Sequence, residues 1–474
     1  MNEKKEYGIL ALLALLLITV VSTCSPLYRA NPYCDANIYL TMGKAWLDGL
    51  IPYRDLYDQK GPILYMLHAL SAMLSRTNFI GIYLLELVCC FFNLVYILKT
   101  LRLWMEEKAA LPVAVAIGAL TYCSLFMCFG DTVEEFSLPI LTASMYLFFR
   151  YAKLDEIPTT RQSLLLGLGI GLIFWTKFTI VATYAGAGLA TLIIAYHRQQ
   201  AKAIWQCIGW AGLAFLGVTG FVLVFFACFG ALKDLLMGYL YFNVFHYNVV
   251  EEGAQHQEMW RGYLVIYAVI LGLLALIPER KSMRLMIVLS MAATAFLFVT
   301  VFCYYYYYQV LLVFLPLLGI AFKRVKDTVL TWVVCIIFTL GVTFTDYNFR
   351  LLLEDRATCF ATPMAERIAQ EGDEDPAILT YNMLNAGIFV QAQATPRVKY
   401  FFTPNSLYPE IMKEQNDYLY SRKAKWVVTP DTLPDSIGYE HVMTSIEYDR
   451  GVGIDMFMHN ETCVPVHLYK RCEK

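Results

Sequence analysis

Long apolar runs alternate with short polar segments over the first 345 residues of the chain. A helix needs about 20 apolar residues to cross the hydrocarbon core of a bilayer, and by that measure the pattern predicts about eleven crossings. They lie near residues 8–24, 79–98, 110–129, 134–151, 163–176, 179–196, 205–229, 261–277, 284–302, 305–322 and 328–345. Lys177 interrupts what would otherwise be one continuous run, so we expect a tight turn between the fifth and sixth crossings. The alternative is a single longer helix, which would invert the orientation of every later crossing.

The basic residues predict an orientation for these crossings. Lys and Arg gather in alternate connections, from Lys4 and Lys5 to Lys323 and Arg324, and the other connections are acidic, aromatic or very short. Cytoplasmic loops carry the excess of Lys and Arg, so we expect the amino terminus inside. Eleven crossings then place the first outer loop, about 27–78, and the carboxy-terminal segment on the extracytoplasmic side of the cell membrane.

The character of the sequence changes after about Asp346, where turn residues separate shorter apolar segments. The segments 377–381 and 425–429 are typical of strands, and 407–420 is typical of a helix. We therefore predict two domains, a mainly α transmembrane bundle at 1–346 and a small extracytoplasmic α/β domain at 347–474. Near the end of the second domain, Cys463 and Cys472 are either bridged or free.

Composition agrees with a multi-pass membrane protein. Hydrophobic residues make up 58% of the chain and charged residues 16%, and the mean hydropathy is +0.51. Both values depart from those of soluble globular proteins. A formal net charge of -2 and basic residues confined to short loops give no surface for nucleic acid.

The first outer loop holds an unusual group of charges beside the bilayer. Asp35 precedes a run with helical spacing, and a second short helix is expected at 63–74, which is too short to cross. Between them lie Asp55, Asp58 and Lys60. Charge next to lipid is costly and often functional. For Asp35, the alternative is an ordinary N-cap of the first short helix.

The order of these features resembles the GT-C class of membrane glycosyltransferases. The shared pattern is a first span, an acidic residue, an amphipathic helix, Gly-x-x-Pro-Tyr at 49–53, and an acid before Lys-x-Pro at 60–62. The class includes the protein O-mannosyltransferases and the lipid A aminoarabinose transferase, and bacterial relatives are described as similar to dolichyl-phosphate-mannose-protein mannosyltransferases (glycosyltransferase family 39). The resemblance implies a GT-C helical bundle that takes a sugar from a polyprenyl-phosphate carrier. The acceptor would be an extracytoplasmic glycan, lipid or protein.

The resemblance also assigns residues. Asp35 matches the catalytic aspartate of the first loop, Asp58 the acid ahead of the lysine, and Lys60 the lysine that meets the carrier phosphate. Gln59 and Gly61 depart from the family pattern, and Asp55 is the alternative to Asp58.

The chemistry of such a transfer fits these residue types. An acceptor hydroxyl must lose a proton as it attacks the anomeric carbon, which a carboxylate such as Asp35 can accept. The leaving phosphate needs a cation, supplied by Lys60 with Arg54 or by a divalent metal ion as cofactor. One base and an activated lipid donor predict direct displacement with inversion. No metal ligands are predicted, because the histidines and glutamates at 246–256 have no spacing typical of a zinc site.

Further candidates lie at other outer turns, each with an ordinary alternative. Glu134 and Glu135 begin the fourth crossing, where acids also complement a helix dipole. The resemblance, through Thr-x-Glu-x-Phe sequences at this turn in similar proteins, favours a role in lining the site. Lys177 is a second phosphate contact or a turn residue. Tyr304 and Tyr305 contact isoprenoid or sugar, or belong to the interfacial belt of aromatic residues.

Two other classes of function remain open at this stage. A transporter or flippase of a lipid-linked or polar substrate also needs many spans, but transporters place their key charges near mid-membrane in repeated halves. Here the charges cluster at one interface, which favours surface chemistry. A non-catalytic assembly protein is the third alternative. The partners expected of a transferase are a polyprenyl-phosphate sugar, an acceptor and membrane lipid.

Overall fold

The computed structural model describes residues 3–246, 276–277, 280–300, 304–353, 360–404, 409–449 and 462–472. The chain divides into two compact units. Unit 1 comprises Met1–Ser22, Leu85–Phe221 and Ala254–Arg350. Unit 2 comprises Thr23–Leu84, Val222–Gly253 and Leu351–Lys474, so the first outer loop belongs with the carboxy-terminal segment.

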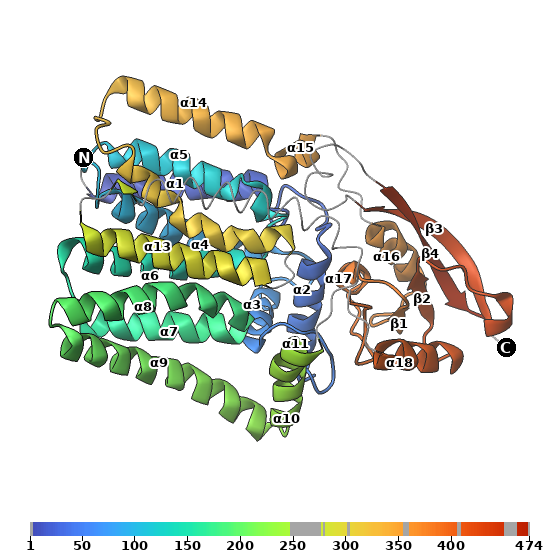
Figure 1. Ribbon diagram of the computed structural model, residues 1–474. Coiled ribbons are helices and arrows are strands. Elements are labelled where there is room, and N and C mark those ends of the chain that lie inside the picture. Colours follow the sequence, from blue (N-terminus) through green and yellow to red (C-terminus); the bar gives the residue numbers. More distant parts are fainter. Residues whose placement is uncertain are drawn as a thin grey trace. The chain divides into compact units, whose positions relative to one another are not determined.

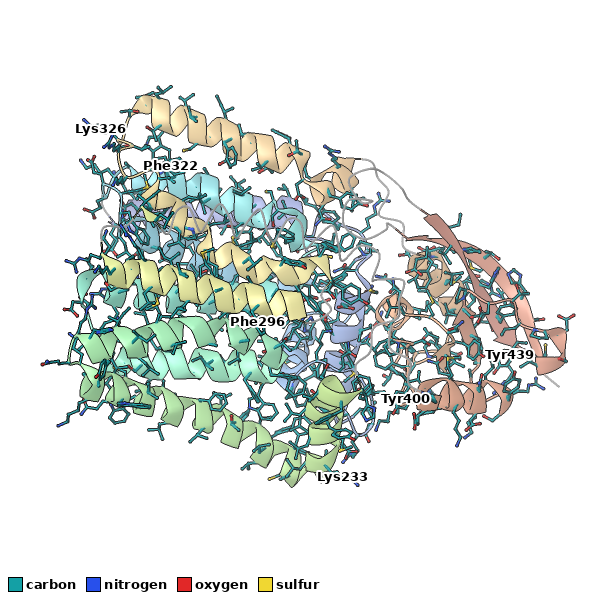
Figure 2. All side chains as sticks on the ribbon, in the orientation of Figure 1. Lys233, Phe296, Phe322, Lys326, Tyr400 and Tyr439 are labelled. Carbon is teal, nitrogen blue, oxygen red and sulfur yellow. The ribbon has the colours of Figure 1, made fainter. Side chains whose placement is uncertain are left out.

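Unit 1 is a bundle of apolar helices that run side by side (Figure 1). They are α1 (Glu3–Val21), α4 (Ile80–Leu101), α5 (Ala110–Tyr122), α6 (Val133–Leu154), α7 (Thr160–Lys177), α8 (Thr183–His197), α9 (Ala201–Cys228), α13 (Lys281–Thr300), the 3-10 helix η5 (Tyr305–Ile320) and α14 (Val329–Thr345). Within the described residues, Ile80–Leu101, Thr160–His197 and Ala201–Cys228 are long and apolar enough to cross a membrane. Lys326 and Phe322 lie at one end of the bundle (Figure 2).

The helices coincide with the runs predicted from the sequence, although α5 is shorter than its run, and most of 261–277 lies outside the described residues. The predicted turn at Lys177 is present. There the backbone is extended, with φ -154° and ψ 96°, and the 3-10 helix η2 (Phe178–Ala182) follows. Both α7 and α8 pack against α6. Small residues allow close packing elsewhere in the bundle, since a Cβ on Gly186 would lie 1.9 Å from the carbonyl oxygen of Leu289.

Unit 2 combines two short helices of the first outer loop with a small α/β domain. The helices of the loop are α2 (Cys34–Leu47) and α3 (Pro62–Ala72), and the segment after α9 forms α10 (Leu232–Leu235), the π-helix η3 (Leu236–Tyr241) and α11 (Phe242–Phe245). The carboxy-terminal part contains α16 (Ala361–Ala369), β1 (Ile378–Thr380), α17 (Gly387–Gln391), α18 (Pro409–Tyr420), β2 (Trp426–Thr429), β3 (Tyr439–Asp449) and β4 (Thr462–Arg471).

The four strands form one mixed sheet in the order β1-β2-β4-β3. β1 and β2 are parallel, with Ile378 opposite Trp426, and the other two pairs are antiparallel. The predicted strands at 377–381 and 425–429 are β1 and β2, and the predicted helix at 407–420 is α18. The elements β3, β4, α16 and α17 were not predicted from the sequence.

The strand β4 decides between the two alternatives for Cys463 and Cys472. Cys463 lies near the start of β4 and Cys472 follows its end, nine positions later. An extended strand advances about 3.3 Å per residue, which separates the two by roughly 30 Å. A disulfide needs Cα atoms within about 7 Å. The bridge is therefore excluded, and Cys472 is a free thiol.

Candidate active site

Asp35 lies in the first turn of α2, in unit 2, and is held by two tyrosines. The hydroxyl of Tyr39, one turn further along the helix, donates to Oδ2 of Asp35 at 3.0 Å, and the hydroxyl of Tyr33 donates to the same oxygen at 3.2 Å. The N-cap residue is Tyr33, and no side chain caps the helix. The N-cap interpretation of Asp35 is therefore wrong. Its half-buried carboxylate is oriented by phenol groups instead.

Asp58 is buried in the loop between α2 and α3, with 5% of its surface exposed. The backbone N–H of Gln59 donates to Oδ1 at 2.7 Å, and the hydroxyl of Tyr65 donates to Oδ2 at 2.7 Å. Burial raises the pKa of the Asp58 carboxyl, and the charge of Asp35 raises it further, whereas the charge of Lys60 and the bond from Tyr65 lower it. Asp35 and Lys60 thus both lie within electrostatic range of Asp58.

Lys60 is buried as well, and tyrosines fix the backbone on both sides of its Cα. Its N–H donates to the hydroxyl oxygen of Tyr65 at 2.9 Å, and its carbonyl accepts from the hydroxyl of Tyr53 at 2.5 Å. Tyr53 has a φ of 69°, in the left-handed region that a bulky residue rarely adopts. Such strain persists where the surrounding structure enforces it, often at functional sites.

Arg54 and Asp55 bind each other. Nε and one terminal nitrogen of Arg54 donate to the two carboxylate oxygens of Asp55 at 2.9 and 2.8 Å. The other terminal nitrogen donates to the carbonyl of Phe229 at 2.8 Å. This pair lowers the pKa of Asp55. Asp55 is thus engaged with Arg54, whereas Asp58 is buried within electrostatic range of Lys60.

In unit 1, the candidates Lys177 and Glu134 form an ion pair. Nζ of Lys177 lies 2.6 Å from Oε1 of Glu134 and 3.0 Å from the centre of the Tyr307 ring. Glu134 is buried, and Lys177 is mostly buried. Tyr307 belongs to the same tyrosine run as the predicted residues Tyr304 and Tyr305, but it was not itself predicted.

Glu135 lies beside Glu134 on α6 and is fully buried. Its backbone N–H donates to the hydroxyl of Thr132, the N-cap of α6, at 3.1 Å. Glu86 of α4 accepts from the hydroxyl of Ser22 at 2.7 Å and from the N–H of Asp131 at 2.8 Å.

Tyr304 and Tyr305 differ in their surroundings. The ring of Tyr304 stacks on that of Tyr306 with centroids 5.7 Å apart. Tyr305 is buried, and its hydroxyl donates to Sγ of Cys128 at 3.0 Å.

No group of three or more His, Cys, Asp or Glu side chains is arranged to hold a metal ion within the ranges that the structure describes. The segment with Glu251, Glu252 and His256 lies outside those ranges.

No protein-family model matches the chain, and no curated protein matches it in sequence. Its fold, however, is similar to that of GT-C membrane glycosyltransferases at low sequence identity. One similar structure is ArnT from Cupriavidus metallidurans bound to undecaprenyl phosphate, with a TM-score of 0.55, 11% identity and 98% of each chain covered. The apo state of ArnT gives a TM-score of 0.54 and 11% identity, over 99% of this chain and 98% of that one.

The arabinofuranosyltransferase AftD from Mycobacteria is also similar, with a TM-score of 0.51 and 14% identity. That match covers 100% of this chain and 42% of AftD, so the chain spans less than half the length of that protein.

Proposed function

We propose that the protein is an integral-membrane glycosyltransferase that moves a sugar from a polyprenyl-phosphate-linked donor to an extracytoplasmic acceptor. The observation that carries the proposal is the grouping of Asp35 and Lys60 around the buried Asp58, on a fold similar to that of ArnT. ArnT has been solved with undecaprenyl phosphate. We extend that type of ligand to this chain.

In the proposed reaction, the acceptor hydroxyl attacks the anomeric carbon of the donor sugar and transfers its proton to Asp35. The bond between the anomeric carbon and the phosphate oxygen breaks, and polyprenyl phosphate leaves with the electron pair. The ammonium of Lys60 neutralises the leaving phosphate. Asp58 supplies an opposite charge within electrostatic range of Lys60 in the buried loop. Attack opposite the leaving group inverts the anomeric configuration.

The remaining candidates receive a role in donor binding under this proposal. In unit 2, Arg54 would be a second cation beside Lys60 for the carrier phosphate. In unit 1, Lys177, which pairs with Glu134, would be a contact for a phosphate group. Glu135, Tyr304 and Tyr305 would contact the sugar or the isoprenoid. Asp55 would hold the guanidinium of Arg54 in place through their ion pair.

The proposal is tested by separating carrier binding from transfer. We expect purified protein to bind undecaprenyl phosphate in native mass spectrometry, and Lys60→Met to weaken that binding by roughly tenfold or more, because a charge-assisted contact is lost. Lys413→Met is a matched control, since Lys413 is exposed on α18. Equal binding by both variants would reject Lys60 as the phosphate ligand.

Asp35→Asn should leave carrier binding intact and abolish transfer. The measurement is the mass profile of cell-envelope glycans and lipids in a deletion strain that carries each variant. The Asp35→Asn strain should match the deletion, and a strain with the exposed Asp435→Asn should match the wild type. Full restoration by Asp35→Asn would contradict the assigned base.

A further inference from the structure

The helix that begins with Asp35 is anchored to the carboxy-terminal part of unit 2 by a buried lysine. Lys44, on the last turn of α2, is 3% exposed. Its Nζ donates to the backbone carbonyl of Phe389, on α17, at 2.9 Å. No carboxylate pairs with Lys44 among the described residues, and burial lowers its pKa to about 8. An apolar side chain would fill this space at less cost, so the amine marks a specific contact between α2 and α17.

A second buried contact joins the start of α2 to the same domain. Nδ2 of Asn37 lies 3.3 Å from Oδ1 of Asn385, just before α17. Both polar atoms of the Asn385 side chain have hydrogen-bond partners. Its Oδ1 also accepts from the N–H of Gly387 at 2.9 Å, and its Nδ2 donates to Glu447 of β3 at 2.8 Å. A Cβ on Gly387 would approach Nδ2 of Asn37 to 3.1 Å, so the two segments are in tight contact.

Asn37 connects this contact to the proposed base. Its Nδ2 also donates to the carbonyls of Asn31 and Tyr33, at 3.0 and 3.1 Å, and so fixes the segment that enters α2. The hydroxyl of Tyr33 in turn donates to Asp35. Asn385 is thus linked to the carboxylate of Asp35 through Asn37, which binds the backbone carbonyl of Tyr33, and through the side chain of Tyr33, whose hydroxyl binds Asp35.

The loop that carries Asp58 is held by the same domain. The N–H of Tyr57 donates to the carbonyl of Lys399 at 2.9 Å. The Tyr57 ring packs edge-on against Tyr400, which is labelled in Figure 2, with centroids 5.4 Å apart. Both acidic residues of the proposed site therefore have a neighbour in sequence that is fixed by residues more than 300 positions later.

We propose that the carboxy-terminal domain is a positioning element for the catalytic loop. Asn385 and the backbone carbonyls of Phe389 and Lys399 hold α2 and Tyr57 in place, and thereby set the direction of the Asp35 and Asp58 carboxylates. Asn385, Asn37 and Lys44 are positioning residues, since they act through others. The expected effect on sugar transfer rests on the proposed function, but the contacts of the carboxy-terminal domain with α2 and Tyr57 can be tested without it.

The test replaces Asn385 by Ala in the full-length protein and follows two readouts. Hydrogen exchange of backbone amides in 31–47 should increase, because Asn37 loses its anchor. The transfer rate kcat should fall roughly ten- to a hundredfold, since small misplacements of a reacting group are costly. Binding of undecaprenyl phosphate should change by less than about threefold, because Lys60 contacts the phosphate. Asn416→Ala, on α18 of the same domain, is the matched control.

Lys44→Met provides a second variant that keeps the apolar stem and removes the donor. It should increase exchange at the end of α2 more than at its start. Unchanged exchange in both variants, with both folded by thermal melting, would overturn the proposal. If exchange increases in the variants but the wild-type protein shows no sugar transfer, the contact between the domain and α2 is supported and the proposed function is rejected. The two failures are therefore distinguishable.

Discussion

Tyrosines surround the two acids of the proposed site, and they determine how those acids behave. The hydroxyl of Tyr39 donates to Asp35, and the hydroxyl of Tyr65 donates to Asp58. The pair Asp35 and Tyr39 could have been found in the sequence, because residues four apart on a helix are neighbours. Tyr65 could not, since its reach to Asp58 depends on how α3 packs beneath the loop.

The protonation of Asp58 gives a testable dependence on pH. Burial raises its pKa, and the bond from Tyr65 and the charge of Lys60 oppose that rise. Tyr65→Phe removes one opposing contribution and should raise the pKa further. If ionised Asp58 is required, the acidic limb of kcat/KM moves to higher pH. Activity is then lost as pH falls through the new pKa.

The measurement is a pH profile of kcat/KM for the wild type, Tyr65→Phe and the exposed control Tyr420→Phe. The control should retain the wild-type profile. An acidic limb that moves to lower pH in Tyr65→Phe would show that the phenol does not stabilise the ionised carboxyl.

At the scale of elements, apolar runs predicted the helices of unit 1 and α2, α3 and α18 of unit 2, and short buried runs predicted β1 and β2. The strand β4 was missed although Val466 and Leu468 alternate with polar residues in it, because Pro465 and the basic end of the strand obscured the pattern. The placement of α17 against α2 had no signal in the sequence, since it rests on a contact between a lysine and a backbone carbonyl.

The close packing of α2 and α3 depends on one glycine. A Cβ at Gly43 would lie 2.5 Å from the backbone N of Ala69 and the backbone carbon of His68. Gly43→Ala should therefore destabilise unit 2 by about 1–3 kcal/mol, although Ala favours helix. Gly212→Ala on α9, where nothing lies within 4 Å, should be neutral or stabilising. Thermal melting in detergent compares the two, and equal melting temperatures would show that α2 and α3 can separate at no cost.

At the scale of the whole molecule, the basic residues in alternate loops predict which side of the membrane each loop faces. The first outer loop and the carboxy-terminal segment were predicted on the same side, and they belong to one compact unit. Charge counting could indicate a shared side but not a shared unit, because it carries no information about distances between loops.

Labelling with a membrane-impermeant maleimide tests this orientation. In a variant without other accessible cysteines, Asp435→Cys should react in intact cells, because unit 2 is predicted to be extracytoplasmic. Lys326→Cys, at an exposed position between η5 and α14, should react only after permeabilisation. Reaction of Lys326→Cys in intact cells would invert the predicted topology and place the proposed site in the cytoplasm.

The contact between Asn37 and Asn385 joins residues 348 positions apart. At synthesis rates of about 5–20 residues per second, the second asparagine leaves the ribosome roughly 20–70 s after the first. The loop with Asp35 must therefore wait through the insertion of every intervening helix before it gains its anchor. Biogenesis itself then delays the onset of activity, and a chain released early would reach the bilayer with its aspartates present but unaligned.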